Sequence, residues 1–76
     1  MEKMNEKLTR RFRWENTANE LREDRRVDDV QLWKHFGIWG FRVWLAEGFF
    51  TAGGSTDFTS HSLYGAITEL ARVEEV

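Results

Sequence analysis

Residues 33–54 read WKHFGIWGFRVWLAEGFFTAGG and hold three of the four Trp and four of the six Phe residues of the chain. Two apolar stretches, residues 38–46 and 49–53, flank the dipeptide Glu47-Gly48. Because Gly at the second turn position supplies the positive φ that a tight hairpin turn needs, the pattern predicts a β-hairpin. This hairpin is the expected centre of the fold.

Side chains alternate across a strand, so the two faces of the predicted hairpin differ in polarity. The wholly apolar face carries Phe41, Val43, Leu45, Phe50 and Ala52. The half-polar face carries Arg42, Trp44, Ala46, Phe49 and Thr51. We expect a helix over residues 60–73, capped by Thr59 or Ser60, to cover the apolar face. Four residues should then pack together: Leu45, Phe50, Ile67 and Leu70.

The segment before the hairpin allows two interpretations. Residues 8–15 alternate apolar and polar side chains as a strand does, whereas Leu8 and Phe12 also have the spacing of a helix. A third strand at 8–15 is slightly favoured, because Thr17 and Glu20 have the spacing of a capping box that starts a new helix.

A helix is predicted over residues 18–36, either continuous or bent between Arg26 and Asp28, and ending at Gly37. The predicted fold class is therefore α+β, a small antiparallel sheet built on a β-hairpin and packed against two or three short helices. With 76 residues, the chain is expected to form a single domain over residues 1–76.

Composition narrows the classes of function. The chain has no Cys, no apolar run long enough for a membrane span and no signal-peptide h-region, so a cytoplasmic protein is expected. Residues 1–27 hold eight Lys and Arg against six Asp and Glu, and residues 28–76 hold three against seven. Nucleic acid is therefore not the expected partner of the chain as a whole. Self-association into a homodimer would add buried area to so small a core.

A basic-aromatic run at residues 7–14 is the best nucleic-acid signal. Its candidate contact residues are Arg10, Arg11, Arg13 and Trp14, where cations would meet phosphates and the indole would stack on bases. The competing interpretation, an element with one solvated basic face and one core face, is favoured.

No constellation of catalytic residues is predicted. His35 and His61 lack the further ligands that a zinc site needs, and Asp57, Ser60 and His61 together are typical of a helix N-terminus. No catalytic residue, metal or cofactor is expected, and the protein is expected not to be an enzyme.

Trp44 and Phe49 are the most informative pair, because they lie on the half-polar hairpin face. They are either covered by residues 18–36 or exposed as the anchor of a binding surface. The predicted partner-binding residues are Trp44, Phe49, Arg42, Asp57 and Glu69, with the two acids at the rim.

In size, acidity, aromatic density and lack of Cys and Pro, the layout resembles the very small α+β proteins that phages and mobile elements encode against bacterial defence machines such as CRISPR effectors. That resemblance implies a non-catalytic protein-binding module that inhibits a larger machine, such as a nucleic-acid-processing complex. The alternative is a small nucleic-acid-binding or transcription-regulatory module using residues 7–14.

Overall fold

The computed structural model describes residues 6–76 of the chain, and the side chains of residues 9–76. The elements in chain order are α1 (Glu6–Arg22), β1 (Val27–His35), β2 (Ile38–Leu45), β3 (Phe49–Phe50), β4 (Asp57–Ser60), α2 (Leu63–Ala71) and β5 (Glu74–Glu75). An antiparallel sheet has the strand order β1-β2-β4, and β3 pairs with β5 separately. The predicted α+β class, a small antiparallel sheet with short helices, is confirmed.

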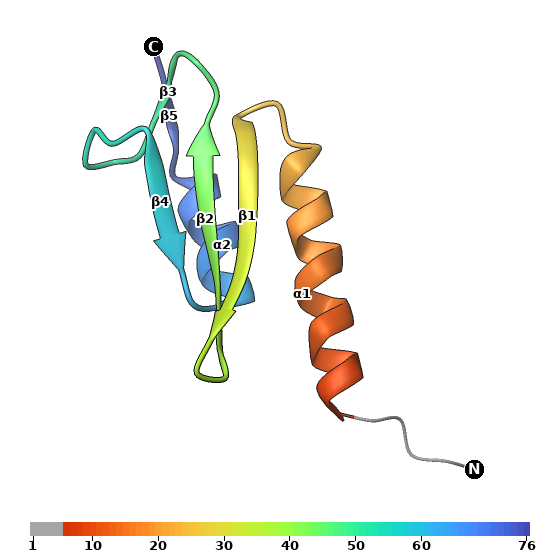
Figure 1. Ribbon diagram of the computed structural model, residues 1–76. Coiled ribbons are helices and arrows are strands. Elements are labelled where there is room, and N and C mark those ends of the chain that lie inside the picture. The colour runs from red at the N-terminus through yellow and green to blue at the C-terminus, as the bar shows by residue number, and fades with distance from the viewer. Residues whose placement is uncertain (1–5) are drawn as a thin grey trace.

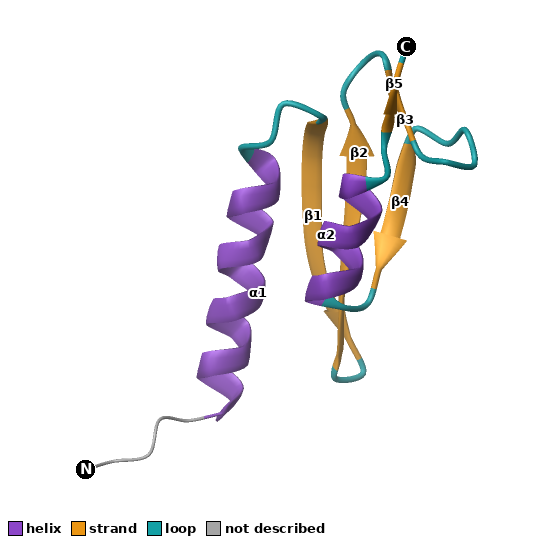
Figure 2. Ribbon diagram, turned by 180° about the vertical axis from the view of Figure 1, so that it is seen from behind, coloured by secondary structure: helices purple, strands orange, loops and turns teal. Residues whose placement is uncertain are grey.

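The helices cover one face of the three-stranded sheet. α2 lies behind the strands in Figure 1 and in front of them after the half turn of Figure 2, and α1 runs beside β1. The ring of Trp14 on α1 lies 4.6 Å from that of Phe41, centroid to centroid, so α1 reaches the same face. Within residues 6–76 no helix covers the opposite face, which we call the open face.

The hairpin at the centre of the sheet joins β1 to β2, one element earlier than predicted. Its two-residue turn is Phe36-Gly37, with φ of 50° and 78°. Positive φ at both positions is the signature of the type I′ turn, whose twist matches the twist of paired strands. The prediction that Gly37 ends a helix is therefore wrong, and the predicted helix over residues 18–36 is a strand from Val27 onward.

α1 corrects the other N-terminal prediction. Residues 8–15 form helix, so the predicted third strand there is wrong, and Thr17 lies inside α1 instead of capping a new helix. Trp14, Ala18 and Leu21 are buried at spacings of four and three, which places them on one face of a continuous helix. Burying that stripe outweighs the alternation that suggested a strand.

The predicted turn at Glu47-Gly48 is present, but the chain does not return along β2. Gly48 has φ of 91°, and Phe49 N–H donates to the carbonyl of Ala46 at 3.1 Å. β3 then departs to pair with β5, with Phe49 opposite Glu75 and Phe50 opposite Glu74. The predicted pairing of residues 38–46 with 49–53 is therefore wrong, because β1 and β4 occupy the two edges of β2.

The core forms where β2 meets the helices. Its buried apolar residues are Trp14, Ala18, Leu21, Val27, Val30, Phe41, Val43, Leu45, Phe49, Ala66 and Leu70. The apolar set Phe41, Val43 and Leu45 is thus confirmed, whereas Ala52 is exposed. Of the four residues expected to pack together, Leu45 and Leu70 are buried, Phe50 is half-buried and Ile67 is 50% exposed.

α2 begins at a different cap from either predicted residue. The Ser62 hydroxyl accepts from Gly65 N–H at 2.7 Å, which satisfies one of the free amides of the first turn. Ser60 Oγ instead donates to the carbonyl of Ser62 at 2.8 Å and tightens the turn before the helix. The helix itself, predicted over residues 60–73, is confirmed from Leu63 to Ala71.

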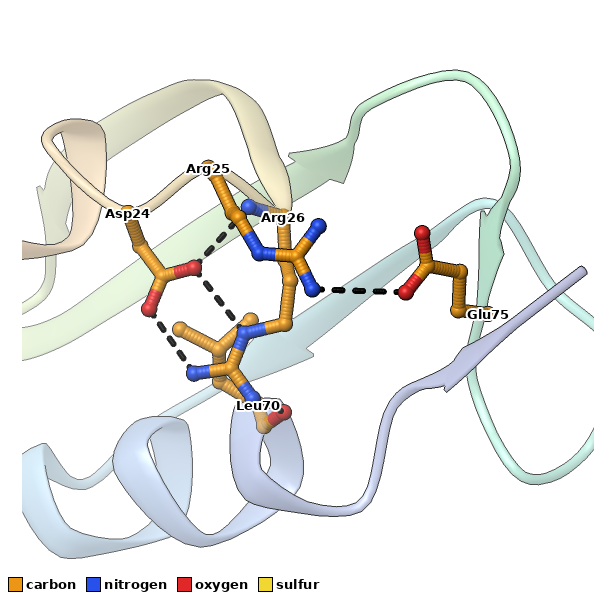
Figure 3. Close-up of polar contacts among 5 residues, drawn as sticks. All are labelled: Asp24, Arg25, Arg26, Leu70 and Glu75. Carbon is orange, nitrogen blue, oxygen red and sulfur yellow. Dashed lines mark hydrogen bonds and ion pairs between the residues drawn. The ribbon is translucent and has the colours of Figure 1, made fainter.

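A polar junction ties the end of α1 to the end of α2 (Figure 3). Arg26 donates to both carboxylate oxygens of Asp24, at 2.9 and 2.8 Å, and to the carbonyl of Leu70 at 3.1 Å. The hydrogen bonds from the Arg26 side chain lower the pKa of Asp24 to about 2, although burial of the carboxylate acts in the opposite direction. Beside this pair, Arg25 meets Glu75 of β5 at 3.3 Å.

The outer edge of β1 has side-chain partners at Val30. The Arg22 guanidinium donates to the Val30 carbonyl at 2.8 Å, and Val30 N–H donates to the Asp29 carboxylate at 2.8 Å. A register shift between Val27 and Asp29 lies directly before this point. Both polar groups that an edge strand would leave unpaired are therefore occupied at this residue.

Candidate protein-binding surface

Strand register decides which side chains stand on the open face. Phe41 and Val43 point to the helices, so their neighbours on β2 point the other way. The residues at open-face positions of the three strands are Asp29, Gln31, Trp33, His35, Ile38, Gly40, Arg42, Trp44, Asp57 and Thr59. This face combines aromatic, cationic, anionic and uncharged polar side chains.

Three of the five predicted partner-binding residues come together on the open face. Arg42 donates a short hydrogen bond to the Asp57 carboxylate on β4, and its guanidinium carbon lies 5.8 Å from the Trp44 ring centroid. Trp44 and Asp57 are directly opposite each other in the register. We call Arg42, Trp44 and Asp57 the arginine cluster. Its ion pair and ring contact restrict the orientations open to the guanidinium.

The other two predicted residues lie elsewhere. Phe49 is only 8% exposed, and the Arg25 guanidinium lies over its ring at 5.2 Å. Glu69 belongs to α2, in the layer behind the sheet. The sequence left open whether Trp44 and Phe49 are covered or exposed, and the two residues differ: Phe49 lies in the core, and Trp44 is half-buried on the open face.

Trp33 extends this surface and was not singled out by the sequence. Its indole lies directly over Gly40, where a Cβ would come within 2.4 Å of the ring. The His61 ring meets it edge to face, with centroids 5.2 Å apart. The available signal was the absence of a side chain at Gly40, since Gly inside a strand often marks a close approach.

Gly40→Ala should move the Trp33 indole off the sheet. The added methyl cannot share space with a ring 2.4 Å away, and Trp33 is the partner that can swing outward. We expect the indole N–H of Trp33 and the ring protons of His61 to change chemical shift in NMR spectra, with a stability change within about 1 kcal/mol. Gly53→Ala is the control, since the nearest atom there is 3.9 Å from the added carbon. Unmoved Trp33 and His61 signals would contradict the stacked position.

The basic-aromatic segment divides between core and surface. Trp14 is 8% exposed and packs against Phe41 and Trp39, so its predicted stacking on bases is not available in this fold. Arg11 pairs with Glu15 at 2.8 Å on the exposed side of α1. Arg10 and Arg13 line an open cleft of about 480 Å³ between α1, the start of β2 and the N-terminus of α2.

The polar residues around the start of α2 have structural partners. Asp57 pairs with Arg42, Ser60 bonds to Ser62, and Nδ1 of His61 lies 3.3 Å from the carbonyl of Trp39. Asp57 and Ser60 belong to β4, and the residue that caps α2 is Ser62, so the interpretation of Asp57 and Ser60 as part of a helix N-terminus is wrong. Across the side chains that the structure describes, no three His, Cys, Asp or Glu residues are grouped so as to hold a metal ion.

Comparison with protein-family models, curated proteins and solved structures gives no significant match. Among the helices of residues 6–76, none has the length and apolar character needed to cross a membrane.

Proposed function

We propose that this chain is a small non-catalytic protein-binding module that inhibits a larger protein machine by occupying one of its surfaces. The observation that carries the proposal is the open face, a sheet surface without a helical cover that presents the arginine cluster beside Trp33. Trp and Arg are enriched among the residues that dominate binding energy at protein interfaces. Restricting the guanidinium before binding lowers the entropy lost on association.

Charge pairing supports a protein partner over nucleic acid. Five arginines already donate to carboxylate, amide or carbonyl oxygens of this chain: Arg11, Arg22, Arg25, Arg26 and Arg42. Asp29 and Asp57 also place carboxylates on the open face, where they would repel phosphate. The inhibitor role additionally draws support from the small size, acidity and aromatic density of the sequence.

Trp44→Ala should weaken binding at least about thirtyfold, because truncating an aromatic anchor at an interface often costs about 2 kcal/mol or more. The protein is immobilised, the retained partner is identified and purified, and affinities are measured by calorimetry alongside thermal melts. Glu69→Lys, in the layer behind the sheet, is the matched control and should bind like the wild type. Inhibition is then tested by adding the module to the purified partner in that partner's own activity assay.

Two outcomes would contradict this function. If Trp44→Ala keeps wild-type affinity while retaining its fold, the open face is not the binding surface. If the purified wild type binds labelled DNA or RNA 20-mers with an affinity that falls steeply with salt, and retains no protein, the nucleic-acid alternative replaces the proposal.

A further inference from the structure

The tip of the β1–β2 hairpin carries a residue that neither burial nor backbone preference explains. Phe36 is 91% exposed and adopts φ of 50° at the first turn position. Asn or Asp is the usual residue there, because a bulky side chain is strained at positive φ. The ring contact that the structure gives Phe36 is with His35, itself exposed, at 4.3 Å between centroids. Such an outlier on an exposed tip points to a role outside the fold.

From this geometry we infer that Phe36 is an anchor that inserts into an apolar pocket of the protein partner, and that carboxylates line the rim of that pocket. The inference rests on the proposed function and adds the chemistry of the partner's surface. It also places a second main contact at the hairpin tip, beyond the arginine cluster.

Apolar side chains around the tip would extend the contact. Ile38, the first residue of β2, is 56% exposed, and Tyr64 on the first turn of α2 is 82% exposed. Both line the 480 Å³ cleft, together with Trp39 and Leu63. A protruding Phe36 ring, two residues before Ile38 at the border of this partly apolar cleft, is a shape that a partner's surface can match.

The charges near the tip determine the rim of the partner's pocket. Arg10 and Arg13 line the cleft, and the Lys34 ammonium lies over the Trp39 ring at 5.2 Å. The acidic residues Glu47, Glu74 and Glu75 belong to the turn after β2 and to β5, at the far end of the sheet (Figure 1). A partner that meets the tip therefore faces cations, and carboxylates complement them.

The first test needs no partner. Phe36→Asn should raise the melting temperature by about 2–8 °C, because it relieves the strained turn and removes no buried surface. Phe12→Asn is the matched control, since Phe12 is 62% exposed on α1 and Phe and Asn have similar helix propensities. The melting temperature of this variant should barely change. A lower melting temperature for Phe36→Asn would show that the ring stabilises the fold, and would overturn the inference.

The second test places the photoreactive residue p-benzoylphenylalanine at position 36, or at position 12 as control, in the full chain inside cells of its natural host. Position 36 should give a protein adduct that position 12 lacks, and the cross-linked protein is then purified. Phe36→Asn should bind it at least about thirtyfold more weakly than the wild type, and Phe12→Asn should bind it normally. Replacing Arg10 and Arg13 by Glu should also weaken binding, and the loss of affinity should be larger at low salt than at high salt.

The outcomes separate the inference from the proposed function. If Phe36→Asn binds like the wild type while Trp44→Ala does not, the anchor fails and the open-face function stands. If the Arg10 and Arg13 reversals tighten binding, the acidic rim is wrong. An adduct to nucleic acid at position 36, with no protein retained by the wild type, would overturn both.

Discussion

Phe41→Ala should lower the free energy of unfolding by about 3–5 kcal/mol, the largest loss expected of any single substitution in the core. Phe41 is 0% exposed, lies at the middle of the central strand and packs against the Trp14 ring. Removing a buried Phe side chain typically costs about 3–5 kcal/mol, while a chain of this length has roughly 4–11 kcal/mol of total stability. Because the Phe41 ring joins the sheet to α1, no neighbouring element can take its place.

Urea titration followed by circular dichroism and by Trp fluorescence measures this effect. Phe12→Ala is the control, because that ring is 62% exposed on α1 and its removal should leave the transition midpoint nearly unchanged. A cooperative transition of Phe41→Ala within about 1 kcal/mol of the wild type would mean that Phe41 is not at the centre of the core.

Replacing Arg26 by Met should destabilise the protein by about 1–3 kcal/mol, since a partly buried carboxylate and a helix-terminal carbonyl lose their donor while the apolar stem is kept. Arg26 and Asp24 retain 32% and 25% of their side-chain exposure, so solvent weakens the pair and favours the lower half of that range. Arg25→Met, which breaks the more exposed contact with Glu75, is the matched control and should cost less. Equal destabilisation of the two variants would contradict the junction's role.

Acid should weaken the same junction. The pKa of Asp24 falls from 3.8 to about 2 on folding, because the Arg26 side chain bonds to its charged form. The stability from this depressed pKa is therefore complete above about pH 4 and is lost as the pH falls through 2. In Asp24→Asn the stability should fall less between pH 4 and pH 2 than in the wild type, as measured by urea titration at each pH. An identical pH dependence in both proteins would show that Asp24 does not titrate with folding.

The second half of the fold could be predicted more closely than the first. The core face of β2 follows from the alternation of Phe41, Val43 and Leu45, and α2 follows from the spacing of its apolar residues. The hairpin was predicted one element too late, because its turn, Phe36-Gly37, lacks the Asn-Gly or Asp-Gly signal of a type I′ turn. β1 was missed because Asp28 and Asp29 resemble a helix cap, and because the register shift beside Val27 breaks the alternation of a strand.

The candidate surface was predictable only where it depended on β2. Trp44 and Arg42 lie two residues apart on one strand, so their shared face follows from alternation alone. The prediction placed Phe49 on that face because it paired residues 49–53 with β2. In that pairing Phe50 stands opposite Leu45 on the apolar face, so Phe49 points to the other face. Asp57 reaches Arg42 through the pairing of β4, which depends on a loop geometry that residue types alone do not determine.

The occupied edge of β1 bears on how the protein behaves at high concentration. A nine-residue strand at the border of a sheet is a template for the stacking of further chains into fibrils. At Val30, the guanidinium of Arg22 and the carboxylate of Asp29 occupy the carbonyl and amide that an incoming strand would need. A further chain that pairs along β1 would therefore first have to displace two side chains at Val30.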